Sequence, residues 1–306
     1  MWITSSTQQA LTPTALALGN FDGLHRGHQT VMAPITRGAL GKNSPLISTV
    51  VTFDPHPREF FSGQRRPLLT PLDEKVQQLE AFGIEQLVLL PFTQALAHLS
   101  PEAFVEDILI AQLQARRVAV GADFCFGRDR SGTAAALQAI ASPHGCEVLI
   151  TPLYHQGPER VSSSAIRHAL AQGDIASATA GLGRPYALQG VVVQGQQLGR
   201  TLGFPTANLQ VPDHKLLPCH GVYRVEVVGD CLGKSPLLGV MNIGRRPTVG
   251  GELQRTIEVH LLDWAGDLYG QKLTVYLDKF LRPEQKFPSL AALKAQIAAD
   301  CQGARV

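Results

Sequence analysis

The sequence predicts an α/β protein of two domains: an N-terminal domain with a doubly wound, mostly parallel sheet, and a small C-terminal antiparallel β-barrel followed by a terminal helix. Three observations predict this. The chain has 306 residues, more than one average domain holds. Strand and helix signals alternate up to residue 182, as in a parallel sheet with crossover helices. From residue 183 onward, short alternating segments separated by Gly, Pro and Asn dominate, as in a closed antiparallel sheet. We therefore predict domains at residues 1–182 and 183–306.

Apolar and β-branched runs predict the strands of the first domain, and capping residues predict its helices. The predicted strands span residues 15–18, 46–53, 86–92, 117–120 and 146–150. One predicted helix begins at Pro101, and another spans residues 134–140. Thr70 is expected to cap a helix that begins at Pro71, and Ser163 or Ser164 is expected to cap the last helix of the domain. Pro34 lies inside the first predicted helix, which should therefore be kinked or short.

The second domain shows strand-length segments in which apolar and polar residues alternate. They span residues 189–194, 221–228, 237–243, 256–262 and 271–280, and a helix is predicted over residues 289–299. Because Glu258 and His260 are separated by one apolar residue, both side chains should point away from the apolar face of their strand. Most strand glutamates are simply exposed, but a carboxylate beside a phosphate site is the natural base for a primary hydroxyl.

The composition argues against several classes of partner. The 27 basic and 25 acidic residues nearly cancel, so nucleic acid is not an expected partner. No basic leader precedes an apolar stretch and no apolar run is long enough to span a bilayer, so no membrane partner is expected. Five scattered cysteines favour a reducing, cytoplasmic location over a disulfide framework. The sequence leaves the oligomeric state open.

The segment Gly19-Asn20-Phe21-Asp22-Gly23-Leu24-His25-Arg26-Gly27-His28 directly follows the first predicted strand. A Gly-rich turn between a strand and a helix leaves backbone N–H groups unpaired, and these favour phosphate. His25 and His28 would share one face of a helix that begins here. Two imidazoles at that place can donate hydrogen bonds to charge that develops on a phosphorus atom. The alternative is a pair of polar loop residues, and a zinc site would need further ligands.

Three further segments end at the same edge of the predicted sheet. Residues 53–57 follow the second strand, and residues 121–127 follow the fourth and bring two aromatic rings. Residues 162–167 follow the fifth, where hydroxyls, a helix N-terminus and the Arg167 guanidinium can hold a polyphosphate. Each segment alone has a structural explanation: a turn, core aromatic residues and an N-cap. Four segments at one edge favour a shared site.

Residues 202–208, Leu-Gly-Phe-Pro-Thr-Ala-Asn, are the corresponding segment of the second domain. In an extended chain, Thr206 and Asn208 point to one face and offer two oxygen ligands to a hard cation that holds ATP phosphates. Gly199 and Gly203 would let the backbone approach a nucleotide closely. A plain turn with polar residues is the alternative.

The motifs of the first domain resemble those of the FMN adenylyltransferase domain of bacterial bifunctional riboflavin kinase/FAD synthetases, a Rossmann-like nucleotidyltransferase. The matching segments are residues 19–28, 52–57 (Thr-Phe-Asp-Pro-His-Pro), 121–127 (Gly-x-Asp-Phe-x-Phe-Gly) and 162–167 (Ser-Ser-x-x-Ile-Arg). Ser164 stands where Thr is common in the family, and Ala165 where a basic residue is common. The hydroxyl is kept, and the lost charge would weaken only a peripheral phosphate contact.

This resemblance implies roles for individual residues of the first domain. His28 and His25 would contact the ATP phosphates. Ser163, Ser164 and Arg167 would close over the pyrophosphate. The other residues implied at ATP are Gly19, Asn20 and Phe21. The residues implied near the flavin are His56, Pro57, Asp123, Phe124 and Phe126.

The motifs of the second domain resemble the riboflavin kinase domain of the same family. The matching segments are residues 199–208, 221–223, 242–248, 258–263, 268–270 and 281–284. The resemblance implies a small barrel with a terminal helix and Mg²⁺ held through Thr206 and Asn208. It also implies Gly199 and Gly203 at ATP, and Glu258 as the base.

The resemblance covers nearly the whole chain and implies two successive reactions. The second domain would transfer the γ-phosphoryl group of ATP to riboflavin, giving FMN and ADP. The first would join FMN to the AMP part of a second ATP, giving FAD and pyrophosphate. Both reactions need Mg²⁺ and neither needs a tightly bound prosthetic group. The alternatives are an enzyme with one activity whose other domain only binds flavin, and a flavin-sensing regulator without catalysis; the intact residue sets of both domains count against them.

Overall fold

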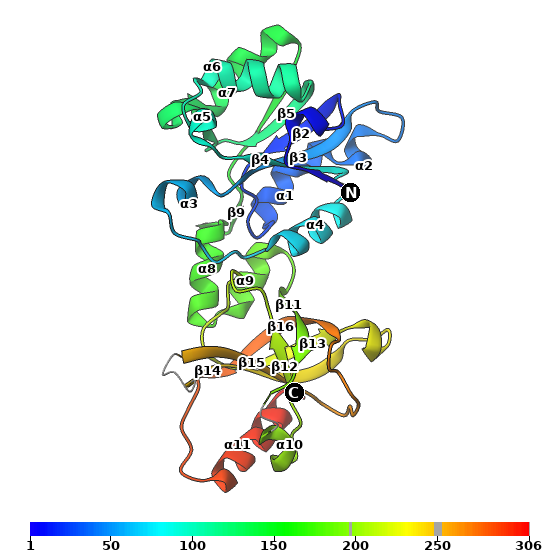
Figure 1. Cartoon of the computed structure of the whole chain (residues 1–306), viewed down its shortest axis with the longest axis vertical. Helices are drawn as coiled ribbons and strands as arrows, with labels where there is room; N and C mark the ends of the chain where they lie inside the picture. The colour runs from blue at the N-terminus through cyan, green and yellow to red at the C-terminus, as the bar shows by residue number, and fades with distance from the viewer. Residues whose placement is uncertain (196–197, 248–252, 306) are drawn as a thin grey trace. The chain divides into compact units, whose positions relative to one another are not determined.

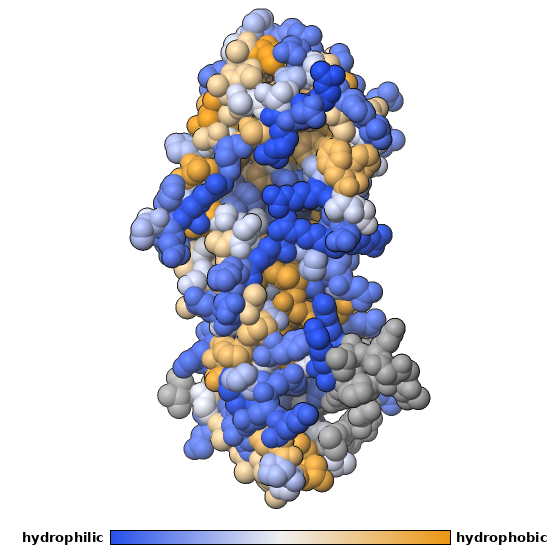
Figure 2. All heavy atoms as spheres, turned by 90° about the vertical axis from the view of Figure 1, so that its left-hand side faces the viewer, coloured by the Kyte–Doolittle hydropathy of each residue, from blue (hydrophilic) through white to orange (hydrophobic). Residues whose placement is uncertain are grey.

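The computed structural model describes residues 1–195, 198–247 and 253–305. The chain divides into two compact units, Met1–Ser163 and Ser164–Val306. Figure 1 shows the elements of each unit. On the face shown in Figure 2, hydrophilic residues predominate and apolar residues form small separate groups. Among the described residues, no helix is both long enough and apolar enough to cross a membrane.

Six parallel strands form the sheet of the first unit, in the order β1-β4-β3-β2-β5-β8. They are β1 (Trp2–Thr4), β2 (Thr14–Leu18), β3 (Ile47–Asp54), β4 (Gln86–Pro91), β5 (Ala115–Gly121) and β8 (Glu147–Thr151). The predicted parallel sheet is confirmed with all five predicted strands, and β1 adds a short edge strand that the pattern did not indicate. The chain continues from β2 to β3 on one side and returns to place β5 on the other. The strand order therefore reverses between β2 and β5.

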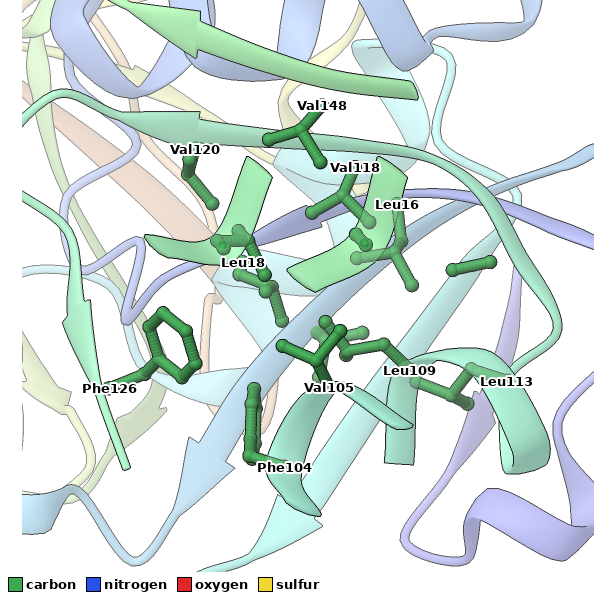
Figure 3. Packing of buried hydrophobic residues seen from close by; sticks show 14 of the residues in the cluster. Leu16, Leu18, Phe104, Val105, Leu109, Leu113, Val118, Val120, Phe126 and Val148 are labelled. Carbon is green, nitrogen blue, oxygen red and sulfur yellow. The ribbon is translucent and has the colours of Figure 1, made fainter. Parts of the chain in front are cut away.

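Helices cover both faces of this sheet, and alternation along β2 separates the two faces. Leu16 and Leu18 face the π-helix Phe104–Gln112 and α7 (Ala134–Ala141). Figure 3 shows these leucines packed against side chains of that π-helix. Ala15 and Ala17 face α1 (Arg26–Met32) and α4 (Leu72–Ala81), whose buried residues include Met32 and Leu79. The small alanine side chains leave room for α1 next to the strand.

One of two expectations about helix ends in the first unit holds, and the other is wrong. The first helix is short, as Pro34 predicted: α1 ends at Met32 and a 3₁₀ turn, Ala33–Ile35, follows. The expectation that Thr70 caps a helix is wrong, because α4 begins at Leu72 and Pro71 precedes it with no side-chain cap. Thr70 is buried instead, and its N–H donates to Asp22 Oδ1 at 3.1 Å.

Six antiparallel strands close into a barrel in the second unit, in the order β11-β12-β15-β14-β13-β16. They are β11 (Tyr186–Val193), β12 (Ala207–Gln210), β13 (Gly221–Val228), β14 (Leu237–Pro247), β15 (Leu253–Leu261) and β16 (Lys272–Arg282). The terminal helix α11 (Leu290–Gly303) is capped by Ser289, whose side chain accepts from the Ala292 N–H. The predicted barrel and terminal helix are confirmed. Arg282 fastens α11 to the barrel through a two-pronged ion pair with Asp300.

Two helices precede the barrel in sequence. α8 (Ser163–Gln172) begins at Ser163, so the expectation that Ser163 or Ser164 caps it is wrong. The pattern did not predict α9 (Ile175–Leu182), which is capped by Asp174 and packs on β11 and β16. The Cys219 N–H donates to the Leu170 carbonyl at 3.0 Å. These contacts join both helices to the barrel, and the predicted domain boundary after residue 182 stays a prediction.

A fragment of residues 164–306 should be more stable than a fragment of residues 183–306. Only the longer fragment keeps α9 on β11 and β16, with Ile175, Ala178 and Leu182 buried. Losing that apolar contact should lower the melting temperature by roughly 5 °C or more. Thermal unfolding of both fragments followed by circular dichroism measures the difference, and equal melting temperatures would show that α9 adds nothing to the barrel.

Candidate functional site

The first candidate site lies at the carboxyl ends of β2 and β5. Residues 19–24 leave β2, and residues 122–124 leave β5, the neighbouring parallel strand. The strand order reverses at this pair. Open α/β sheets bind nucleotides in the crevice outside such a point. Two of the four sequence motifs of the first domain, residues 19–28 and 121–127, therefore begin where the fold favours a nucleotide.

The loop of residues 19–24, here called the phosphate loop, holds an unusual backbone conformation. Phe21 and Leu24 have φ of 47° and 45°, and Gly23 has φ of 90°. Bulky side chains rarely adopt positive φ, and each such residue costs about 1–3 kcal/mol. Both side chains are buried, with exposures of 2% and 3%. A Cβ atom on Gly19 would lie 3.0 Å from the Phe21 ring, so the ring folds back over a position that only glycine leaves open.

His25 and His28 stack face to face next to this loop. Their ring centroids are 3.5 Å apart with an interplanar angle of 19°, and the edge of Phe21 meets the His28 ring. His25 precedes α1 instead of lying on it, and its Nδ1 accepts a hydrogen bond from the His28 N–H at 3.2 Å. The ring proton of a neutral His25 is then on Nε2, which leaves that nitrogen as a donor.

Gly27 has a packing reason to stand between the two histidines. A Cβ atom there would lie 3.2 Å from Cε1 and Nδ1 of His25, and 3.4 Å from the Tyr154 side chain. Alanine would otherwise suit the first turn of a helix better than glycine. The glycine of the His-x-Gly-His motif therefore keeps space for the His25 ring.

Hydrogen bonds to Asn20 and Asp22 hold the middle of the phosphate loop to the rest of the first unit. The Asn20 carbonyl oxygen accepts from Thr52 Oγ1 at 3.2 Å and from Lys75 Nζ at 2.9 Å. Asp22 accepts from the Thr70 N–H through its carboxylate and from Ser163 Oγ at 2.8 Å through its carbonyl oxygen. The sequence analysis missed Lys75, because a single lysine on a predicted helix has no distinguishing signal.

The Lys75 side chain is partly buried. Burial lowers its pKa, while Asp22 and Asp54 act in the opposite direction. The amide oxygen Oδ1 of Asn20 is buried nearby and has no hydrogen-bond partner among the described residues. A buried polar atom of this kind is ordinarily satisfied, so a bound molecule is its natural partner.

His56 and Pro57 begin a helix that the sequence pattern did not predict. His56 caps α3 (Pro57–Ser62), with its Nδ1 accepting from the Arg58 N–H at 3.0 Å. Burial lowers the pKa of His56, and the charge of Arg66 lowers it further. The imidazole therefore stays neutral to lower pH than a free histidine does.

An aromatic cluster surrounds α3 at the ends of β3 and β4. Phe53, Phe60 and Phe61 each meet the Phe92 ring edge to face, with centroids 5.3–5.8 Å apart. Phe61 is 72% exposed, although most aromatic side chains bury far more of their surface. The sequence signal for it was the pair Phe60-Phe61, three residues after Pro57, and the sequence analysis did not use it.

The loop after β5 combines an exposed carboxylate with two rings. Asp123 is ion-paired with Arg160 of β10 (Glu159–Arg160). Phe124 is partly buried and stacks parallel to Phe126, with centroids 5.7 Å apart. Phe126 is 5% exposed and packs on Phe104 in the core, so its structural explanation holds.

Ser163, Ser164 and Arg167 lie in the first turns of α8. Ser163 reaches the Asp22 carbonyl, whereas Ser164 is exposed and Arg167 is partly buried. Ser164 and Arg167 fall in the second compact unit. Their contact with pyrophosphate stays a prediction.

The second candidate site lies on the outer face of the barrel, where Glu258 is central. Ile257 and Val259 are 4% and 1% exposed and face the interior, so Glu258 points outward as predicted. In the strand register Glu258 pairs with Asn208 of β12 on one side and with Asn242 of β14 on the other. Directly opposite residues have Cβ atoms roughly 5 Å apart, so the carboxyl group stands between two amides. Asn242 was noted in a matching segment but not assigned a role, and Thr248 of that segment lies outside the described residues.

Thr206 and Asn208 lie against two glycines of the preceding segment. A Cβ atom on Gly195 would lie 2.2 Å from Asn208 Nδ2. One on Gly199, in α10 (Leu198–Leu202), would lie 3.2 Å from Thr206 Oγ1 and 2.4 Å from the Phe204 carbonyl oxygen. Gly203 ends α10 with φ of 89°. Gly199 therefore allows close packing of Phe204 and Thr206 of the same chain. A Cβ atom on Gly203 would meet none of the described residues within 4 Å.

An apolar cavity of about 550 Å³ opens beside Thr206. Its lining includes Thr206, Val259, Trp264, Leu268 and Tyr269. Nearby, His260 Nδ1 lies 2.8 Å from the Pro205 carbonyl oxygen and its ring meets Phe204 edge to face. Those contacts tie the Pro-Thr-Ala-Asn segment to β15, the strand of Glu258.

Known proteins match both units. The family model for FAD synthetase matches residues 7–165, and the family model for riboflavin kinase matches residues 182–306. The chain is 43% identical over 286 residues to the bifunctional riboflavin kinase/FMN adenylyltransferase of Escherichia coli K12, covering 93% of this chain and 90% of that protein. The chain belongs to this family. Its counterpart in Haemophilus influenzae is 38% identical over 304 residues, covering 98% and 96% of the two chains.

A solved structure matches the whole fold as well. A crystal structure from Streptococcus pneumoniae, described as a macrolide-efflux protein, superposes with a TM-score of 0.87 at 30% identity. The match covers 99% of this chain and 98% of that one. The two-part architecture of the bifunctional family is therefore also present in a protein described by another activity.

Gly27→Ala should impair FAD formation by this family member without affecting FMN formation. The added methyl group presses on the His25 ring, and a small misplacement of reacting groups lowers the rate by roughly tenfold or more. Steady-state assays of each reaction measure the effect. Gly38→Ala is the matched control, since a Cβ atom there meets nothing within 4 Å. Equal loss in both variants would mean that the His25 contact is irrelevant.

Proposed function

We propose that the phosphate loop and the stacked histidines carry out adenylyl transfer, and that the outer face of the barrel around Glu258 carries out riboflavin phosphorylation. The family membership supports the two activities: riboflavin and ATP give FMN and ADP in the second unit, and FMN and ATP give FAD and pyrophosphate in the first. The observation that carries the assignment of residues is the stacked His25–His28 pair beside a strained loop at the reversal of strand order.

In the first unit, the reaction is an in-line substitution at the α-phosphorus of ATP by an FMN phosphate oxygen. His28 and the Nε2–H of His25 donate to phosphate oxygens as negative charge develops there. Gly19, Asn20 and Phe21 line the same phosphates, and the buried Asn20 Oδ1, which can only accept, takes a donor such as an O–H or N–H group of the nucleotide. Ser163, Ser164 and Arg167 hold the departing pyrophosphate, because a guanidinium and hydroxyls suit phosphate oxygens.

The flavin ring binds on the aromatic cluster next to the phosphate loop. The exposed Phe61 ring offers a flat apolar face of the kind on which an aromatic ring stacks. His56 and Pro57 at the start of α3, with Asp123 and Phe124 from the loop after β5, would complete the flavin site. Phe126 supports Phe124 from the core rather than presenting a face of its own.

In the second unit, Glu258 accepts the proton of the riboflavin 5′-hydroxyl as that oxygen attacks the γ-phosphorus of ATP. Thr206 and Asn208 would hold Mg²⁺, which neutralises phosphate charge when bound. The residues present fit this ion: both side chains offer hard oxygen atoms, and Asn208 stands opposite Glu258. Among the described residues no group of three His, Cys, Asp or Glu could hold a metal. Magnesium sites commonly take most of their ligands from phosphates and water.

The cavity beside Thr206 accommodates the adenine ring of ATP. Its apolar lining and its place next to Thr206 suit a flat base whose phosphates extend toward the Mg²⁺ ligands. ATP and Mg²⁺ are then the only small molecules required besides the flavins, and no tightly bound prosthetic group is needed. All five cysteines are free, which suits the reducing cytoplasm where we place the reaction.

A crossed pair of substitutions tests this division. His28→Ala should lower FAD formation from FMN by roughly a hundredfold or more, the scale for loss of one transition-state donor, with FMN formation unchanged. Glu258→Gln should lower FMN formation about a hundred- to ten-thousandfold, the scale for loss of a general base, with FAD formation from supplied FMN unchanged. Separation of flavins after incubation with riboflavin or FMN, ATP and Mg²⁺ gives both rates.

Matched controls use the same residue types away from the sites. His98→Ala removes an exposed histidine from the first unit, and Glu226→Gln removes an exposed strand glutamate from the barrel. Both variants should retain both activities. If Glu258→Gln kept near-normal kinase turnover, the hydroxyl proton would leave to phosphate or water, and Glu258 would not be the base. An unchanged rate of FAD synthesis in His28→Ala would reduce His28 to a structural role.

A further inference from the structure

We propose that Lys75 is a positioning residue for adenylyl transfer: it turns the peptide group between Asn20 and Phe21 so that the Phe21 N–H is presented to the ATP phosphates. The proposal rests on the role of the phosphate loop proposed above. It adds to that role a residue from outside the sequence motifs and a specific main-chain donor.

The first step is the direction of the Asn20 carbonyl group. Its oxygen accepts from Lys75 Nζ at 2.9 Å and from Thr52 Oγ1 at 3.2 Å. Thr52 lies on β3 and Lys75 on α4, and both elements belong to the packed body of the first unit. Two donors from different elements therefore fix the oxygen toward the body of the unit.

The second step follows from peptide geometry. The Asn20–Phe21 bond is not among the cis bonds of the described chain. In a trans peptide the C=O and the N–H point in opposite directions. The Phe21 N–H therefore points away from Lys75 and Thr52, and among the described residues it has no hydrogen-bond acceptor. A main-chain donor of a buried residue ordinarily has a partner, and a phosphate oxygen supplies one.

The surroundings of Lys75 suit a lysine at this position. Burial lowers the pKa of the Lys75 ammonium, and the charges of Asp22 and Asp54 act against that lowering. Hydrogen bonds from a charged donor are stronger than those from a neutral one. Phe21 is held at positive φ, which an unrestrained loop would leave. The bonds to Asp22 act on the carboxylate and carbonyl group of the residue after Phe21, whereas, among the described residues, only Lys75 and Thr52 bond to the Asn20 carbonyl oxygen.

Lys75→Met tests the proposal, because it keeps the length of the side chain and removes the ammonium. We expect kcat for FAD formation from FMN to fall roughly tenfold to a hundredfold per folded molecule, with a smaller change in KM. FMN formation by the same protein should remain unchanged and shows that the second unit is intact. Lys75→Arg retains a cation with N–H donors and should recover most of the rate. Lys42→Met, at an exposed lysine of the first unit, is the matched control and should behave as wild type.

A spectroscopic measurement reads the Phe21 amide itself. Asn20-Phe21 is the one Asn-Phe pair in the sequence. Protein labelled with ¹³C-carbonyl asparagine and ¹⁵N-phenylalanine therefore gives a single correlation peak for this amide. In the full-length wild type and in Lys42→Met, an unreactive ATP analogue with Mg²⁺ should shift that peak. In Lys75→Met the peak should start at a different position, and the analogue should shift it less.

The outcomes separate positioning from a purely structural role. A lysine that only stabilises the fold would leave kcat per folded molecule and the response of the Phe21 peak unchanged, and that result overturns the proposal. Thr52→Val removes the second donor to the same carbonyl oxygen, so it should lower the rate less than Lys75→Met does and move the peak in the same direction. It provides the test if Lys75→Met does not fold, and an unaltered peak in Thr52→Val then counts against the proposal. Failure of the wild-type peak to respond to the analogue overturns it as well. If wild-type protein made no FAD from FMN, the proposed function itself would fail, which is a distinct result.

Discussion

Phe21 and Leu24 are bulky, buried side chains held at positive φ, and this loop conformation is the constraint on which the first site depends. A conformation that costs about 1–3 kcal/mol per residue persists only when its surroundings determine it. Here the surroundings are hydrogen bonds to Asn20 and Asp22, together with the packing of Phe21 over Gly19 and against His28. Because these contacts come from β3, α4 and the start of α8, the loop is ordered by the fold before any substrate binds.

The two candidate sites are held in place by different features of the fold. In the parallel sheet, the reversal of strand order brings loop backbone and imidazoles to one edge. In the barrel, antiparallel register alone places Glu258 between Asn208 and Asn242. The glycines at 195 and 199 leave room for the side chains of Asn208 and Thr206. A shift of one residue in the pairing of β15 would send Glu258 to the barrel interior. The second site is therefore fixed by pairing, and the first by a strained turn.

Much of this could be predicted from the sequence, because it depended on local patterns. Apolar runs marked five of the six parallel strands, alternation marked the outward direction of Glu258, and Pro34 marked the early end of α1. The missed features depend on contacts between distant residues. Lys75 acquires its role only when α4 lies beside the loop of Asn20, 55 positions earlier in the chain. Short elements such as α3, and with it the exposed Phe61 ring, have too few residues to show a periodic pattern.

We propose that the strained loop after β2 presents its main-chain donors and the stacked histidines to the phosphates of ATP. A crystal structure of the full chain with Mg²⁺ and an unreactive ATP analogue tests it most directly. The account predicts that the analogue bound to the first unit has its phosphates within hydrogen-bond distance of the Phe21 N–H and of the His25–His28 pair, with Phe21 and Leu24 still at positive φ. Phosphates bound away from the ends of β2 and β5, or a loop that relaxes to negative φ when they bind, would contradict it.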